Sequence, residues 1–266
     1  MQAITVRDRN AGIAGLSLTD LPYPHAAEND VIVRVHAAGF TTGELDWPGT
    51  WTDRAGRDRT PSVPGHELSG VVVELGYGTT GLGVGQRMFG LTAWQGLFDH
   101  GRLTTGQTVL IHGAAGGVGS IAVQLAREVG ARVIGTGRTS ARELALALGV
   151  DTFLDLQTDK LEDAGEVDVV FDVIGGDILD RSAALVRAGG TLVSIATPPK
   201  VRPTDGRAVF FIVEPDRARL ADLATRLRDG RLKPVVGAVR PLAEAPAAFA
   251  PAKRTPGKTI LRVIED

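Results

Sequence analysis

The stretch from Thr108 to Arg138, TVLIHGAAGGVGSIAVQLAREVGARVIGTGR, decides the fold. Its apolar run Val109–Ile111 is typical of a strand that is buried on both faces, and four glycines follow within seven residues. From Val118 the apolar residues recur at helical spacing, Gly130 provides a helix stop, and a second apolar strand follows over Arg132–Gly135. We therefore predict a strand–turn–helix–strand unit of an α/β protein.

A glycine turn between a buried strand and a helix is suited to binding an anion. It offers free backbone N–H groups and the positive end of the helix dipole, and glycine lacks the Cβ atom that would keep a pyrophosphate away. A glycine pattern alone is a weak signal, but this one lies in a βαβ unit of about thirty residues, which supports the assignment. We predict a dinucleotide site; a glycine-rich turn of another α/β protein is the alternative. The residues expected at the site are Gly113, Ala115, Gly116, Gly117, Val118 and Gly119.

The residues after the second strand indicate which nicotinamide cofactor binds. In NAD-binding proteins an Asp or Glu binds the adenosine ribose there, whereas an Arg accommodates the 2′-phosphate of NADP. No carboxylate occurs from Thr136 to Arg142, and the guanidinium of Arg138 offers a charge-assisted fork. We predict NADPH, with Arg138 as the main phosphate ligand and Ser140 or Arg142 assisting. The alternative is that Arg138 is a solvated surface residue.

The sequence around the glycine turn resembles a known family. The segments GLTAWQGLFDHGRL and GQTVLIHGAAGGVGSIAVQLA are similar to the coenzyme domain of the zinc-independent medium-chain dehydrogenase/reductases, the quinone oxidoreductase group, which uses the AAGGVG form of the turn. PGHELSGVVVELG and VGQRMFG resemble the GroES-like, β-rich catalytic domain of that family. The resemblance implies a GroES-like domain over residues 1–90 with a C-terminal return over 240–266, and a Rossmann NADP-binding domain over 91–239.

The chain departs from the layout of that family between Gly90 and Leu91. The family has further strands here, and roughly forty residues are missing at about 8–12 residues per strand. A shortened catalytic domain would widen the substrate cleft or leave sheet edges to be covered. A natural short form, an engineered deletion and an omitted segment are three explanations that the sequence leaves open.

Strands and helices keep alternating beyond the first unit, which predicts a doubly wound parallel sheet. The further strands are predicted over Thr152–Asp155, Val167–Ile174, Thr191–Ile195 and Ala208–Val213, with a helix from Gly175 to Gly189. Ligands bind beyond the carboxyl ends of such strands, so we expect Val173, Gly175 and Ile195 beside the cofactor. Core packing and ordinary turn glycines are the alternative. The family resemblance adds Phe211, because that region reaches the nicotinamide in the family.

The catalytic residues are less well defined by the sequence. Hydride transfer needs the nicotinamide and the accepting carbon held close together, and a group that stabilises the developing oxyanion or enolate. In FTTGELDWPGTW, residues 40–51, we expect Thr41 and Thr42 near the nicotinamide and Trp47 and Trp51 along the substrate pocket. Thr41 best matches the polar residue that the family places there. A turn-capping threonine and a packing aromatic are the alternatives.

Composition argues against several classes of function. The 266 residues carry a net charge of −2, which gives no electrostatic basis for binding nucleic acid or a membrane. No apolar run approaches the length of a membrane span, and the first ten residues lack the apolar segment of a signal peptide. There is no cysteine, which excludes disulfides, thiolate catalysis and the Cys ligands of zinc dehydrogenases and fits a cytoplasmic protein. His66 of the GHE triplet has no soft partner ligand, so we expect no metal site; Glu44 and Asp46 are the only alternative ligands considered.

These features predict an NADPH-dependent oxidoreductase that acts on a small-molecule substrate. The substrate is expected to be a quinone or an α,β-unsaturated carbonyl compound, either an enone or an enoyl compound. A nucleotide-binding sensor or scaffold without redox turnover is one alternative, and a cyclase or lyase on the same fold is another. The apolar strand over Ala208–Val213 and the manner of pairing in the family predict a homodimer joined through the sheet edges of the coenzyme domains.

Overall fold

The computed structural model of the chain describes residues 1–28, 30–40, 43–53, 56–65, 67–78, 91–214, 216–249 and 255–264. Its internal contacts divide it into two units, Met1–Phe89 with Val236–Asp266, and Gly90–Val235. The domain boundaries predicted from the sequence, 90/91 and 239/240, lie within a few residues of this division. Among the described residues, no helix is long and apolar enough to span a membrane.

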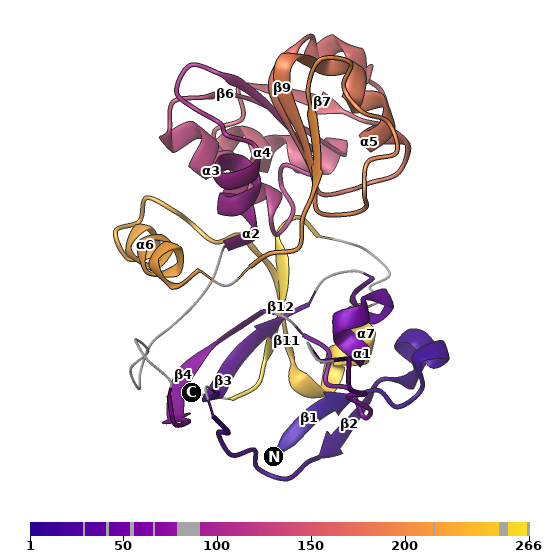
Figure 1. Cartoon of the computed structure of the whole chain (residues 1–266), viewed down its shortest axis with the longest axis vertical. Coiled ribbons are helices and arrows are strands. Elements are labelled where there is room, and N and C mark those ends of the chain that lie inside the picture. The colour runs from indigo at the N-terminus through magenta and orange to yellow at the C-terminus, as the bar shows by residue number, and fades with distance from the viewer. Residues whose placement is uncertain are drawn as a thin grey trace. The chain divides into compact units, whose positions relative to one another are not determined.

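The unit Gly90–Val235 is built on a six-stranded sheet in the order β10-β9-β8-β5-β6-β7, in the upper part of Figure 1. All five neighbouring pairs run parallel. The strands are β5 Thr108–Ile111, β6 Arg132–Gly137, β7 Thr152–Asp155, β8 Val167–Asp172, β9 Val186–Ser194 and β10 Arg207–Phe210. The strand order reverses between β5 and β8, as in a doubly wound Rossmann sheet, so the predicted α/β fold is confirmed.

Helices connect these strands across the two faces of the sheet (Figure 1). They are α2 Leu91–Trp94, α3 Gly119–Glu128, α4 Arg142–Leu148, α5 Asp177–Ser182 and α6 Arg217–Arg228, with short turns η3 Gln95–His100, η4 Thr139–Ala141, η5 Leu161–Ala164 and η6 Ala183–Leu185. α3 and α4 are each followed by a glycine with positive φ, Gly130 at 84° and Gly149 at 113°, a conformation that glycine adopts without a steric penalty.

The core of this unit follows from strand register. Leu110 lies opposite Ile134 on one side and Val170 on the other, and Val170 lies opposite Leu192. These four side chains form one buried row, which packs together with Leu179 of α5. Each fully buried aliphatic side chain of this size contributes about 1.5–3 kcal/mol to folding.

Several predicted boundaries were wrong. The strand expected over Ala208–Val213 is β10, which ends at Phe210, and the strand expected over Thr191–Ile195 is β9, which runs from Val186 to Ser194. The helix expected to run from Gly175 to Gly189 ends as α5 and η6 at Leu185, and residues from Val186 onward belong to β9. Glycine has low helix propensity, which disfavours a helix through Gly189 and Gly190. A Cβ on Gly190 would lie 2.6 Å from the carbonyl oxygen of Asp168 in β8, so glycine allows β9 to pair closely with β8 here. β8 ends at Asp172 rather than Ile174, because the next backbone amides turn back onto the Asp172 carboxylate.

The other unit is rich in β structure. β1 Gln2–Thr5 and β2 Ser17–Asp20 form an antiparallel pair around η1 Arg9–Gly15. A four-stranded mixed sheet has the order β11-β12-β3-β4, with β3 Val31–Gly39, β4 Glu67–Leu75, β11 Val236–Pro241 and β12 Lys258–Arg262. Short helical segments complete the unit: η2 Glu44–Asp46, α1 Pro48–Trp51, η7 Leu242–Glu244 and α7 Ala245–Phe249. Its core gathers residues from both ends of the chain, including Val6, Trp51 and Phe249.

Candidate functional site

The predicted cofactor residues all follow the carboxyl ends of parallel strands, so the sheet brings them to one edge. The turn after β5 holds Gly113, Ala115, Gly116, Gly117, Val118 and Gly119, and the loops after β6, β8, β9 and β10 hold Arg138, Ser140, Val173, Gly175, Ile195 and Phe211. This edge, next to the reversal of strand order, is where ligands bind in sheets of this kind.

Backbone amides of the glycine turn are candidate donors to a ligand. The amide of Ala114 donates to the carbonyl oxygen of Thr136 at 3.0 Å, and the amide of Gly116 donates to that of Gly113 at 2.8 Å. In the part of the chain that the structure describes, no carbonyl oxygen accepts a hydrogen bond from the amides of Gly117, Val118 or Gly119. These amides stand at the start of α3, where the helix dipole is positive, so the turn can hold an anionic group.

Close packing explains why two positions of this turn require glycine. A Cβ atom on Gly119 would lie 2.1 Å from the carbonyl oxygen of Gly113, so any side chain there would force α3 away from the turn. Gly113 has a φ of 68°, and a Cβ on it would lie 2.9 Å from Cγ2 of Val173. The turn after β5 and the loop after β8 are therefore in contact.

His112 fixes the base of the turn from inside the core. Its side chain is fully buried, with Nδ1 2.9 Å from Oγ1 of Thr136 and Nε2 2.7 Å from Oγ of Ser182. The Ser182 hydroxyl donates to the carbonyl oxygen of Ile178 at 2.6 Å, so it accepts from His112, and Nε2 carries the imidazole proton. Burial lowers the pKa of His112 to about 4, which keeps the ring neutral.

Arg138 is available to a ligand at the edge beside β6. It is exposed, and it forms an ion pair with none of the carboxylates in the described part of the chain. Arg142 differs: its guanidinium lies 3.4 Å from Asp159 and 5.1 Å from the ring centre of Phe153. Ser140 is exposed as well. Of the two arginines considered from the sequence, Arg138 is therefore the better phosphate ligand.

A carboxylate that the sequence reasoning did not weigh lies nearby. The Thr139 hydroxyl donates to Asp155 at the end of β7, and this hydrogen bond, together with that from the amide of Gln157, lowers the pKa of the Asp155 carboxyl. The carboxylate is thus already occupied by neighbouring donors, whereas Arg138 is not.

Sequence reasoning also missed Asp172 and Ser194, which are the last residues of β8 and β9 and lie opposite each other in the sheet. Both are fully buried, and the Ser194 hydroxyl donates to Oδ2 of Asp172 at 2.9 Å. The signal that would have found them is a polar residue at the carboxyl end of each of two adjacent buried strands.

Phe211 contributes an apolar wall after β10. It is 8% exposed, and its ring centre lies 4.3 Å from that of His100 in η3. The backbone just beyond it is fastened by Gln95, whose side-chain amide donates to the carbonyl oxygen of Glu214 at 2.8 Å and accepts from the amide of Glu214 at 3.0 Å.

The catalytic candidates lie in the β-rich unit. Thr41, Thr42 and His66 fall outside the described residues. Trp47 is 39% exposed, whereas Trp51 is a core residue whose indole N–H donates to the carbonyl oxygen of Leu45 at 2.6 Å. Of the suggested metal ligands, Glu44 is buried and accepts the amide of Gly65 at 2.8 Å. No cluster of three or more His, Cys, Asp or Glu side chains suited to a metal occurs among the described residues.

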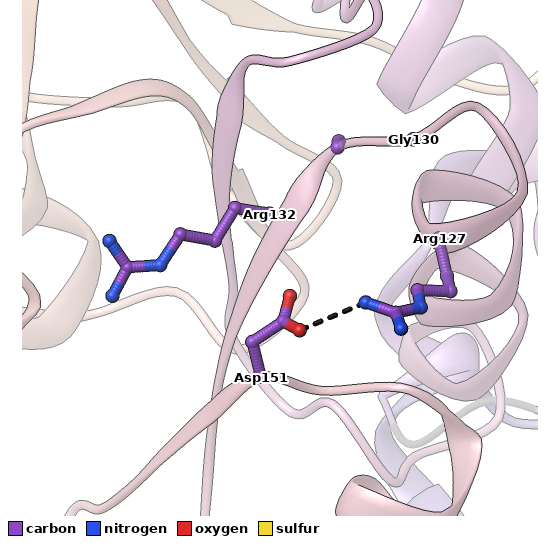
Figure 2. A pocket seen from close by; sticks show the side chains of 5 residues that line it. Arg127, Gly130, Arg132 and Asp151 are labelled. Carbon is purple, nitrogen blue, oxygen red and sulfur yellow. Dashed lines mark hydrogen bonds and ion pairs between the residues drawn. The ribbon is translucent and has the colours of Figure 1, made fainter.

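A separate pocket lies at the opposite edge of the sheet. Figure 2 shows it at the amino ends of β6 and β7, where Arg127 forms an ion pair with Asp151 at 2.9 Å and Arg132 points away. Its volume is about 370 Å³. The C-terminal, negative end of α3 borders this pocket, whereas the N-terminal, positive end of α3 follows the glycine turn.

Two family models match overlapping parts of the chain. "Alcohol dehydrogenase GroES-like domain" matches residues 27–143, and "Zinc-binding dehydrogenase" matches residues 117–214. The chain is similar to NorB, a protein of the spectinabilin polyketide synthase system of Streptomyces orinoci, with 32% identity over 91% of this chain and 14% of NorB. It is 26% identical to the NADPH-dependent alkenal/one oxidoreductase of Arabidopsis thaliana, over 82% of this chain and 67% of that protein.

A solved structure shares the fold. The quinone oxidoreductase of Coxiella burnetii matches with a TM-score of 0.85 and 23% identity, over 99% of each chain. The alignment with NorB extends over 305 positions although this chain has 266 residues, so NorB carries residues inside the matched region that this chain lacks. This agrees with the shortening inferred from the sequence.

Proposed function

Because the chain belongs to the medium-chain dehydrogenase/reductase superfamily as a quinone oxidoreductase-like member, we propose that it uses NADPH to reduce a quinone or an α,β-unsaturated carbonyl compound. Membership makes it an NAD(P)-binding oxidoreductase; NADPH and the class of acceptor are the proposed part. The observation that carries NADPH is the exposed Arg138 after β6, which has no ion pair with the described carboxylates and lies at the edge that also holds the glycine turn. The name of the Arabidopsis relative, which includes both NADPH and alkenal/one, supports the same choice.

The residues present fit such a cofactor from end to end. The amides of Gly117, Val118 and Gly119 would bind the pyrophosphate, and Arg138 would bind the 2′-phosphate. The loops after β8 and β9, with Val173 and Ile195, would border the nicotinamide end. Bound NADPH supplies a hydride, and the protein contributes position and exclusion of water. Thr41 as the polar group at the nicotinamide and Trp47 at the substrate pocket stay predictions.

The alternative is a nucleotide-binding protein without redox turnover. The shortening inferred from the sequence between Gly90 and Leu91 motivates this alternative, because it would reduce the catalytic domain. A panel of acceptors distinguishes the reductase from this alternative. The panel contains quinones, enones and enoyl thioesters. Oxidation of NADPH with one of these acceptors supports the reductase; tight NADPH binding with no oxidation by any of them supports the alternative.

Cofactor choice is tested with Arg138→Ala. Charge-assisted hydrogen bonds contribute about 1.5–3 kcal/mol, so we expect the Kd for NADPH to rise on the order of 10- to 100-fold and the Kd for NADH to stay unchanged. Arg132→Ala is the matched control, because Arg132 is also exposed but lies at the opposite edge of the sheet (Figure 2). Equal losses for the two cofactors would remove Arg138 from the 2′-phosphate.

We also propose a homodimer that forms through β10. β10 is an outermost strand in the order of the six-stranded sheet. Apolar side chains in this strand or just after it are exposed: Phe210 by 39%, Ile212 by 78% and Val213 by 42%. An apolar strand edge in water tends to pair with another chain. Light scattering that gives the mass of two chains supports the proposal, and the mass of one chain at all concentrations contradicts it.

A further inference from the structure

The buried carboxylate of Asp172 organises the loop that follows β8. Oδ1 accepts the amide of Ile174 at 3.2 Å, and both oxygens accept the amide of Gly175, at 3.1 and 3.0 Å. Gly175 and Gly176 both have positive φ, 76° and 69°, so the loop turns sharply around the carboxylate. The conformation of residues 173–175 thus depends on Asp172.

Ser194 extends this arrangement to the loop after β9. Its hydroxyl donates to Asp172 and accepts the amides of Ala196 at 3.2 Å and Thr197 at 3.4 Å. The two loops also touch, because a Cβ on Gly175 would lie 3.1 Å from both Cβ of Ala196 and Oγ1 of Thr197. One carboxylate and one hydroxyl therefore hold both loops in a fixed relation.

The arrangement is costly to folding, which argues for a role beyond stability. Asp172 is fully buried and has no ion pair with the described Lys, Arg or His residues. Burial raises the pKa of its carboxyl, and the hydrogen bonds from Gly175, Ser194 and Ile174 offset only part of that effect. Two apolar side chains in place of Asp172 and Ser194 would pack at the ends of these strands without the free-energy cost of burying a carboxylate.

We propose that Asp172 and Ser194 are positioning residues, which act through the loops 173–175 and 195–197 to place the nicotinamide end of the cofactor. This inference rests on the proposed function. It separates two tasks within one site: the glycine turn and Arg138 provide affinity through the phosphates, whereas Asp172 and Ser194 provide alignment for hydride transfer.

Kinetics of four variants test this division. A misplacement of about 1 Å at the reacting centre can cost on the order of 100-fold in rate, so Asp172→Asn and Ser194→Ala should each lower kcat on the order of 10- to 100-fold. The Kd for NADPH should change by less than about 3-fold, because the phosphate contacts remain. Because a hydrogen bond joins Asp172 to Ser194, the losses of kcat in the two single variants should combine less than additively in the double variant. Ser194→Thr, which keeps the hydroxyl, should recover most of kcat.

Thr5→Ala is the matched control. Thr5 is also a fully buried hydroxyl residue, and its Oγ1 lies 2.9 Å from Oγ1 of Thr19 in β2, but it forms no hydrogen bond with either loop in the described part of the chain. We expect this variant to lose stability and to keep kcat. A drop in kcat equal to that of Ser194→Ala would mean that any buried hydroxyl loss disturbs the site, and it would overturn the inference.

Hydrogen–deuterium exchange provides a readout that needs no turnover. Without NADPH, Asp172→Asn should speed exchange both in 174–175 and in 196–197, although it directly removes acceptors only from the first loop. Unchanged exchange in 196–197 overturns the coupling. A wild type that oxidises no NADPH with any acceptor overturns the proposed function and the positioning role together. An active wild type whose Asp172→Asn and Ser194→Ala variants keep kcat overturns the positioning role alone.

Discussion

The burial of His112 predicts a particular pH dependence of stability. An unfolded histidine titrates near 6.5, whereas burial lowers the pKa of His112 to about 4 in the folded chain. The folded state therefore favours the neutral ring, and its contribution is complete above pH 6.5 and is lost as the pH falls from 6.5 towards 4. Each pKa unit corresponds to about 1.4 kcal/mol, so lowering the pH from 7 to 5 should cost about 2 kcal/mol of the free energy of unfolding at this residue.

Urea unfolding at pH 7 and pH 5, followed by circular dichroism, measures this loss. His112→Gln removes the titrating group, so the free energy of unfolding of this variant should fall by about 2 kcal/mol less than that of the wild type between the two pH values. His25→Gln is the control for the loss of an exposed histidine, because the His25 side chain is 83% exposed. If the free energy of unfolding of His112→Gln shows the same pH dependence as that of the wild type, the prediction that the folded chain keeps His112 neutral is wrong.

Three further substitutions test the turn and the strand edge. Gly119→Ala brings a Cβ within 2.1 Å of the carbonyl oxygen of Gly113, so it should lower the free energy of unfolding by about 1–3 kcal/mol, measured by urea unfolding. Gly116→Val meets only that same oxygen at 3.1 Å, so the fold should persist while NADPH binding is lost; titration that shows unchanged binding would place the pyrophosphate elsewhere. Ile212→Asp introduces a charge at an exposed apolar position beside β10, and light scattering should show the proposed dimer dissociating. A dimer that survives this change forms through another surface.

Local patterns predicted the elements that depend on nearby residues. α3 was found from apolar spacing, and its end from Gly130. The end of α5 was missed because residues from Val186 onward follow no clear periodicity and extend only through pairing with β8.

The site divides in the same way. The glycine turn is a continuous motif, so its residues could be named from sequence. Asp172 acquires its role only beside Ser194, 22 residues further on, and His112 only beside Thr136 and Ser182, which are 24 and 70 residues away. Such partners are set by the order of strands in the sheet, which no short stretch of sequence contains.

The clasp between Gln95 and Glu214 has an implication for how this chain varies in length. Gln95 lies four residues after Leu91. Its side-chain amide forms hydrogen bonds with both the backbone amide and the backbone carbonyl of Glu214, as a residue of a neighbouring strand would. These hydrogen bonds thus join the start of the coenzyme unit to the segment after β10, before the first strand of the sheet begins. Segments inserted or removed upstream of Leu91 need not disturb the six strands, which gives evolution and protein engineers a tolerant junction for exchanging the preceding module.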